Sequence, residues 1–437
     1  MGGRTVNCRA DGLLGAIVAS ESLGVTDTLI NGAGGCRSRA QIMMHDLIPQ
    51  YYPENRGCCR SKYFSRQSRL PCTYLNNEDI IFGSREKVSD GIVSVSGITG
   101  RRVLLLDTLG ASLICTDYEG MMDSEGRPPI IMDSDLSAMS FSEGYDMAMC
   151  SILSSLDLEE GDDGSVNIIG YGIMDPGWET GAHDLVHMLE RMGLKVNCIP
   201  GCLPDENDVM SVGKASLNIM IHPEYCTGTA RMLWERTGTP HLRPSMGAPV
   251  GYPAIRSFIR EVADATGRDP TDALRHVDDD ADSVHRVLMN YDRIPKSLRS
   301  KGFVVESDSS VAYPLMMWMM GTFGMSPRRI SFPDEEYGEE ISGYLSEKGF
   351  TDALTGIEGD VEAVFSDGMD ALEGRLSDNN RAHIEVCMPR GRCLDLMGRT
   401  VVGPKGCRYI LDELLNGITR FRCGQPTDIN FRPGNED

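Results

Sequence analysis

Short apolar runs alternate with amphipathic helical patterns along most of this chain, and this alternation constrains the fold more than any other feature. The runs within residues 101–110, 165–172 and 216–222 are typical of strands buried on both faces of a parallel sheet. Residues 179–199 then carry apolar residues at helical spacing, a glycine stop and a further strand. Together these segments predict a strand–helix–strand unit.

The same succession returns in the C-terminal third of the chain. The pattern over 301–332 predicts a strand, a helix and a strand, and 363–368 and 382–388 are typical of short strands. Residues 403–418 predict a final helix. Strands that alternate with helices in this way favour parallel sheets with helices on both faces. We therefore expect an α/β protein with three doubly wound, Rossmann-like domains.

Two segments mark the expected boundaries between these domains. The acidic, glycine-containing stretch 157–165 is typical of a linker, and 268–297 is typical of a charged helical crossover. The predicted domains are therefore 1–160, 161–290 and 291–437, the last of which ends with the C-terminal helix.

The composition argues against several classes of function. The 437 residues carry a net charge of −22 and show no cluster of Lys and Arg, which argues against nucleic-acid binding. No apolar run reaches the length of a membrane-spanning helix, and the N-terminal residues lack the apolar core of a signal peptide. We therefore expect a cytoplasmic protein without a membrane partner, in which the 14 cysteines are not paired as disulfides.

Three cysteines in the first 115 residues have surroundings that suit metal binding. Cys8 precedes the small-residue segment 12–17, Cys36 ends the glycine-rich turn NGAGGC, and Cys115 follows an apolar run. Cysteine thiolates are the usual protein ligands of iron–sulfur clusters. A glycine turn lets a bulky cluster approach the backbone, because no side chain blocks it. Cys8, Cys36 and Cys115 are therefore the candidate metal ligands, and 1–160 is the expected cluster-binding domain.

These contexts, together with the element EDIIFG at residues 78–83, resemble the nitrogenase component 1-like oxidoreductase superfamily. That superfamily includes nitrogenase component 1 subunits, cofactor-assembly scaffold subunits and dark-operating tetrapyrrole reductases. Its first cluster cysteine precedes a Gly-Ala-containing helix, as Cys8 does here. Its second cysteine follows a GxxGC turn, as Cys36 does, and an E-D-x-x-F-G-G element comes next. The resemblance continues over most of the chain.

One position departs from the family pattern. Where the family has its third cysteine, an alignment without gaps places Leu109, six residues before Cys115. The chain would then hold its cluster with two cysteines, recruit Cys115, or use Cys58, Cys59 or Cys72. The resemblance implies an iron–sulfur cluster, and the departure leaves its type open between [4Fe-4S] and a larger P-cluster-like form.

A second candidate site lies at the end of the run 216–222. In catalytic nitrogenase subunits a cysteine just after a comparable strand holds the metallocofactor, and the matching position here is His222. His222 or Cys226 could still contact a second complex iron–sulfur cofactor or a substrate, because α/β proteins bind ligands at the carboxyl ends of their strands. The alternative is a strand-end histidine with only a local hydrogen bond.

The resemblance implies a subunit of an ATP-dependent, low-potential reductase. A separate P-loop iron–sulfur protein would hydrolyse ATP, since this chain lacks the G-x-x-x-x-G-K-[ST] pattern. Electrons would pass through an interface cluster to a substrate or a second metallocofactor. Two or three cysteines do not complete a Cys₄ set, so we expect a homologous component 1-type subunit in a dimer or heterotetramer. The alternatives are a non-catalytic scaffold for cluster assembly and a cluster-less structural partner of an active homologue.

Overall fold

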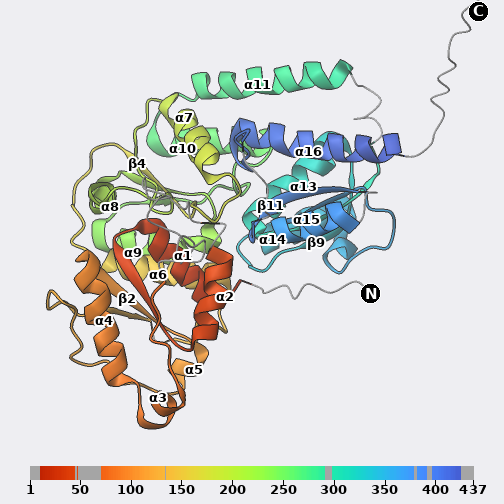
Figure 1. Ribbon diagram of the computed structural model, residues 1–437. Coiled ribbons are helices and arrows are strands. Elements are labelled where there is room, and N and C mark those ends of the chain that lie inside the picture. The colour runs from red at the N-terminus through yellow and green to blue at the C-terminus, as the bar shows by residue number, and fades with distance from the viewer. Residues whose placement is uncertain are drawn as a thin grey trace, which may run out of the picture.

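Three parallel sheets, each covered by helices, build the chain in the computed structural model (Figure 1). The structure describes residues 10–44, 47, 70–132, 134–290, 298–377, 381–390 and 396–424. Cys8, Cys58 and Cys59 lie outside this part of the chain. The expected α/β class with parallel sheets is confirmed. Within the described ranges, no helix is both long enough and apolar enough to cross a membrane.

The sheets contain three, four and four strands, and all of their strand pairs are parallel. The first sheet consists of β1 (Thr26–Asn31), β2 (Arg102–Asp107) and β3 (Ile130–Met132). The second consists of β4 (Val166–Ile169), β5 (Val196–Cys198), β6 (Leu217–Met220) and β7 (His241–Leu242). The third consists of β8 (Gly302–Glu306), β9 (Ser326–Ser331), β10 (Ala363–Asp367) and β11 (Ala382–Cys387).

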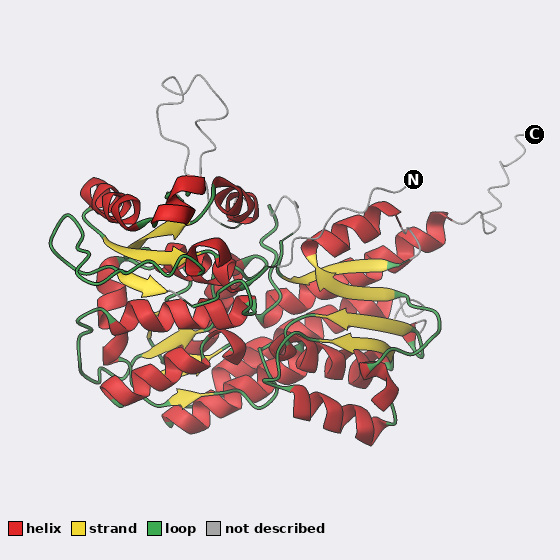
Figure 2. Ribbon diagram, turned by 90° about the horizontal axis from the view of Figure 1, so that it is seen from below, coloured by secondary structure: helices red, strands yellow, loops and turns green. Residues whose placement is uncertain are grey.

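Helices lie on both sides of the strands when the molecule is viewed from below (Figure 2). Those around the first sheet are α1 (Gly12–Leu23), α2 (Gly34–Met44), α3 (Asn77–Phe82), α4 (Arg85–Thr99), α5 (Leu109–Ser112) and α6 (Phe141–Ser154). The middle of the chain forms α7 (Trp178–Glu190), α8 (Glu206–Met210), η2 (Ser211–Lys214), η3 (Pro223–Tyr225), α9 (Thr227–Thr237), α10 (Tyr252–Thr266) and α11 (Thr271–Asn290). The last part forms α13 (Ser309–Phe323), α14 (Gly338–Lys348), η4 (Thr351–Leu354), α15 (Gly368–Ser377) and α16 (Gly403–Gly424).

The sheets share one strand order, which places a topological switch point in each. In the orders β5-β4-β6-β7 and β9-β8-β10-β11, the first strand lies between the second and the third. The first sheet follows the same plan, because an isolated parallel bridge joins Cys72 to Ile30 on the side of β1 opposite β2. The first strand of each sheet is therefore followed by one neighbour on one side and the next on the other. The order in which strands are added reverses between β1 and β2, between β4 and β6, and between β8 and β10. Ligands in doubly wound proteins bind at the carboxyl ends of the strands at such points.

Packing between the sheets is extensive. One continuous apolar core spans the second and third sheets and includes Phe258, Trp318 and Leu414. Helix α16, expected to close the third domain, packs on β11 and also on α7 and α10 of the middle unit (Figure 1). Because this packing continues from one unit to the next, it does not mark domain boundaries. The ranges 1–160, 161–290 and 291–437 remain a proposed division of the chain.

Helices α1 and α6 cross with almost no space between their backbones. A Cβ atom added at Gly144 would lie 2.1 Å from the carbonyl oxygen of Gly12. We expect Gly144→Ala to lower the free energy of unfolding by about 3 kcal/mol, because the obstacle is backbone that cannot swing away. Chemical denaturation measures the change. The control is Gly343→Ala in α14, where nothing lies within 4 Å of the added atom. That variant should gain about 0.5–1 kcal/mol from helix propensity, and equal effects of the two substitutions would contradict the account.

Candidate functional site

The glycine-rich turn after β1 leads directly into a helix. Helix α2 begins at Gly34, so Cys36 lies in its first turn rather than at the end of a turn. The turn passes so close to the end of β2 that a Cβ atom on Gly32 would lie 2.5 Å from the hydroxyl oxygen of Thr108. The N-terminal end of a helix carries partial positive charge, which stabilises a thiolate or an anionic cluster beside it.

Cys72 lies at the same edge of the sheet. The segment that contains it runs beside β1, where the backbone N–H of Thr73 donates to the carbonyl of Ile30 at 3.0 Å. The Cys72 thiol donates to the carbonyl of Gly32 at 3.2 Å, and its sulfur accepts the N–H of Tyr74 at 3.4 Å. Burial raises the pKa of the Cys72 thiol, and the nearby Cys36 sulfur adds to the rise. Cys36 and Cys72 thus lie at the same edge of the first sheet, on the two segments that follow and flank β1.

The other predicted ligands are placed differently. Leu109 begins α5 at the end of β2 and is 51% exposed, so no sulfur is offered from the family's third position. Cys115 follows α5, is exposed, and has a left-handed backbone conformation with φ of 52°. Its Sγ lies 3.5 Å from the carbonyl oxygen of Ser112. Among the described contacts, none joins Cys115 to Cys36 or Cys72.

The chemistry of this edge fits an iron–sulfur cluster. Cys36 and Cys72 are free, half-buried thiols next to glycine backbone. The N–H of Tyr74 on the Cys72 sulfur is the kind of hydrogen bond that tunes cluster potentials. Two thiolates are fewer than the four of a complete ligand set, so the remaining ligands must come from elsewhere.

His222 occupies the corresponding edge of the second sheet, just after β6. Its Nδ1 lies 2.7 Å from the hydroxyl oxygen of Ser310, and its Nε2 lies 3.0 Å from an oxygen of Asp175. The single hydroxyl proton of Ser310 goes to Glu224 at 2.5 Å, so Ser310 accepts from Nδ1–H. Burial alone would lower the pKa of His222, but Asp175 and Glu224 outweigh it and raise the pKa to about 9. Each ring nitrogen therefore lies within 3.0 Å of a protein oxygen, and the raised pKa favours the protonated ring.

Three units of the chain meet at Tyr225. Its ring packs edge-on against Phe141 and Tyr145 of α6, and its hydroxyl donates to Asp308 of the third unit at 2.8 Å. Burial raises the pKa of Asp308 to about 6. Burial also raises the pKa of Glu224 well above its usual range. The junction is thus a buried, strongly acidic site around one histidine cation.

Cys226 is buried beside His222. Its thiol donates to the carbonyl of His222 at 3.4 Å, and burial raises its pKa well above the usual range. A Cβ atom on Gly170, whose backbone is left-handed with φ of 72°, would lie 2.6 Å from the sulfur. Both side chains contact protein atoms in this structure. Their contact with a cofactor or substrate therefore remains a prediction.

Sequence reasoning missed several residues of this junction. Asp175 follows β4, Asp308 follows β8, and Asp334 follows β9. The sequence carries a pattern that indicates them. Each acidic residue comes soon after the carboxyl end of a strand, where ligand-binding residues concentrate in α/β proteins.

The Ser310 hydroxyl links His222 to Glu224, and its removal should be costly. We expect Ser310→Ala to lower the free energy of unfolding by about 1–3 kcal/mol, because it leaves two buried polar groups without this partner. Ser342→Ala is the control, since Ser342 bonds only to the carbonyl of Glu339 at an exposed position. Urea denaturation compares the two variants. A loss at Ser310 no larger than that at Ser342 would show that this hydrogen-bond network contributes nothing measurable.

Comparison with known proteins agrees with the fold. Residues 12–419 match the family of nitrogenase component 1 type oxidoreductases. The chain belongs to this family. Two structures of nitrogenase Cp1, at pH 6.5 and pH 5, align with TM-scores of 0.74 and 0.65 at 16% and 15% identity. They cover 96% and 98% of this chain, and 94% and 92% of theirs.

Similar sequences occur among the subunits B of light-independent protochlorophyllide reductases. The subunit from Dinoroseobacter shibae is 28% identical over 161 residues, which are 36% of this chain and 30% of that protein. The subunit from Halorhodospira halophila is 23% identical over 253 residues, which are 55% of this chain and 44% of that protein. The chain thus spans less than half the length of these curated relatives.

Proposed function

We propose that this chain is a subunit of a nitrogenase-like, ATP-dependent reductase complex that holds an iron–sulfur cluster at the carboxyl edge of its first sheet. The observation that supports this most is the position of Cys36 in the first turn of α2 and of Cys72 against the glycine turn before it, at one strand edge of a family member. When bound, the cluster would supply a one-electron relay at low potential. Electrons would come from a separate P-loop iron–sulfur protein and go to a substrate or second metallocofactor.

We assign the ligands among this chain's own residues. Cys36 offers its thiolate at the start of α2, and Cys72 offers a second thiolate from the segment beside β1. Cys8, which lies outside the described residues, matches the family's first cluster cysteine and is a further ligand that the sequence predicts. Cys72 replaces the sulfur missing at Leu109, in preference to the exposed Cys115.

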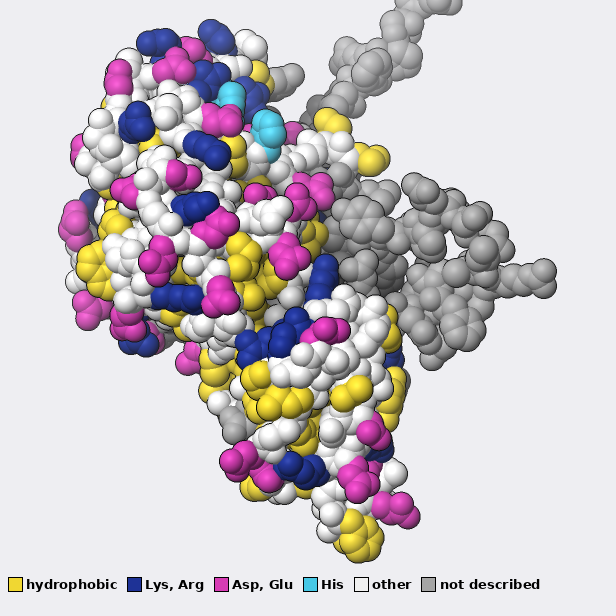
Figure 3. All heavy atoms as spheres, turned by 90° about the vertical axis from the view of Figure 1, so that its left-hand side faces the viewer, with side chains coloured by type: hydrophobic (Ala, Val, Ile, Leu, Met, Phe, Trp, Pro, Cys, Tyr) yellow, Lys and Arg dark blue, Asp and Glu magenta, His cyan; other side chains and the backbone are white. Residues whose placement is uncertain are grey.

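A second subunit would cover an exposed apolar face formed by α3 and the segment after α5. On α3, Ile81 and Phe82 are 72% and 84% exposed, and Leu113 after α5 is 77% exposed. The hydroxyls of Ser84 and Thr116 are 2.7 Å apart, which joins the segments that follow α3 and α5. Hydrophobic side chains are visible at the lower tip of the molecule, where α3 lies (Figure 3). Exposed apolar patches of this kind mark interaction sites, so we assign this face to a homologous component 1-type subunit.

A scaffold for cluster assembly is the second candidate function. It is favoured by Leu109 and His222, which stand where catalytic relatives have cysteine ligands. Turnover with a reductant, ATP and the P-loop protein separates the two, because a scaffold would release its cluster instead of reducing a substrate.

Anaerobic purification followed by iron and sulfide analysis tests the proposal. We expect iron and acid-labile sulfide in equal amounts, bound to an oligomer. A protein that is folded and oligomeric but free of iron and sulfide would identify a cluster-less structural partner instead.

A further inference from the structure

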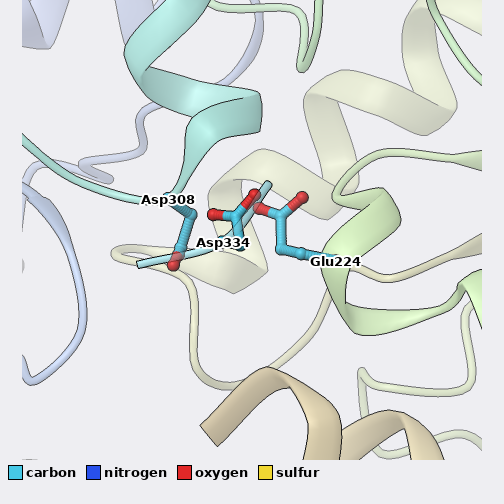
Figure 4. Close-up of side chains that lie close together, drawn as sticks. All are labelled: Glu224, Asp308 and Asp334. Atoms are coloured by element: carbon cyan, nitrogen blue, oxygen red, sulfur yellow. The ribbon is translucent and has the colours of Figure 1, made fainter. Parts of the chain in front are cut away.

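Three carboxyl groups converge where the second and third sheets meet. Glu224 belongs to η3, whereas Asp308 and Asp334 follow β8 and β9. One oxygen from each group lies within 4.8 Å of the others. Asp334 lies between the other two, and its carboxyl group faces that of Glu224 (Figure 4). Because these residues are distant in sequence, the fold itself has assembled the cluster.

Both Asp334 oxygens accept hydrogen bonds from Ser309, and Oδ1 also accepts the N–H of Glu336, so the unpartnered acceptor at this cluster belongs to Glu224. Tyr225 donates to Oδ2 of Asp308 at 2.8 Å, and Ser310 donates to Oε1 of Glu224 at 2.5 Å. The other Glu224 oxygen, Oε2, is fully buried and has no hydrogen-bond partner among the described residues. Buried acceptors in native proteins almost always have a partner, so this oxygen points to a bound group.

The local charges favour a cation as that group. In the ranges that the structure describes, no Lys or Arg forms an ion pair with Glu224, Asp308 or Asp334. The cationic side chain nearest to Glu224 is His222, whose Nδ1 is 3.8 Å from Oε1. His222 also faces Asp175 at 3.0 Å, so one positive charge is shared among several carboxyl groups. Burial raises the pKa values of Glu224 and Asp308 because their charges lack a counter-charge, and a bound cation would supply one and favour the ionised forms.

We propose that Glu224, Asp308 and Asp334 bind a hard divalent cation of the Mg²⁺, Mn²⁺ and Ca²⁺ class between the second and third sheets. An all-oxygen ligand set selects such ions over those that prefer sulfur. Oxygens on opposite sides of one ion are about 4.2 Å apart for Mg²⁺ and about 4.8 Å apart for Ca²⁺, so the three can share an ion. Asp308 and Asp334 are only partly buried, which leaves coordination positions open to water or a substrate oxygen.

Binding of Mn²⁺ to the full chain, freed of metal with EDTA, tests this site through electron paramagnetic resonance. We expect one saturable Mn²⁺ per chain, displaced by Mg²⁺ or Ca²⁺. Glu224→Gln and Asp334→Asn should each weaken binding by at least about tenfold, because affinity follows the charge of the ligand set. The matched control is Asp184→Asn, a buried carboxylate that already pairs with Lys405 at 3.0 Å across the same two units. It should leave Mn²⁺ affinity unchanged.

Thermal unfolding provides a second measurement if one variant is poorly stable. Mn²⁺ should raise the melting temperature of the wild type and of Asp184→Asn, but not that of Glu224→Gln. Absence of saturable binding, or equal affinity in the wild type and Glu224→Gln, would overturn the site. Since the three carboxylates are not cluster ligands, either outcome leaves the iron and sulfide analysis unaffected.

Discussion

Replacing Cys36 with Ala is expected to remove the iron–sulfur cluster and its visible absorbance almost completely. The thiolate at the start of α2 is the ligand that both the glycine-rich turn and the family pattern support. Loss of a partner that only orients a metal ligand costs about 10–100-fold in affinity, so loss of a ligand itself should cost at least as much. Iron analysis and absorbance of the anaerobically purified variant measure the effect.

The same experiment assigns the third ligand. We expect Cys72→Ala to lose the cluster as Cys36→Ala does, and Cys115→Ala to retain it. Cys150→Ala is the matched control, because Cys150 is also a half-buried free cysteine but lies on α6. Loss of iron from Cys115→Ala with full retention in Cys72→Ala would assign the third position to Cys115.

The second large effect is expected at the exposed apolar face of α3 and the segment after α5. A carboxylate at position 82 in Phe82→Asp would be desolvated in the complex with the homologous subunit. We expect at least about 30-fold weaker assembly, about 2 kcal/mol, as for the loss of an interface hot spot. Sedimentation of the anaerobic preparation measures it, whether the partner is a second copy or another subunit.

Leu376→Asp is the control for assembly. Leu376 is 78% exposed on α15 of the third unit, comparable to Phe82 at 84%. Its substitution adds the same charge at a position distant in sequence from Cys36, Cys72 and Phe82. It should therefore leave assembly unchanged. If both variants assemble like the wild type, the apolar face does not bind the partner subunit.

The sequence predicted most strands because their patterns were unambiguous. The buried runs that became β2, β4 and β6 are short and aliphatic, and 403–418 carries a clear helical period. Strand β1 was not predicted, because Thr and Asp occupy its first three positions and only Leu29 and Ile30 are apolar. The tertiary contacts of β1 with β2 override that weak local pattern.

The candidate site was harder to predict for a different reason. Cys36 was found because its glycine context is local in sequence. The partnership with Cys72 depends on a single bridge to Ile30 in an otherwise irregular segment. The junction of His222 with Ser310 and Asp175 joins residues more than 40 positions apart, and no sequence spacing encodes such a contact.

The most direct test of the central claim is electron paramagnetic resonance of the purified assembly after mixing with the P-loop iron–sulfur protein, reductant and ATP. We expect a signal from the reduced cluster of this assembly, distinct from that of the P-loop protein alone, that forms only with ATP and is absent in Cys36→Ala. An iron-loaded assembly whose signal is the same without ATP, or the same in Cys36→Ala, would contradict the central claim.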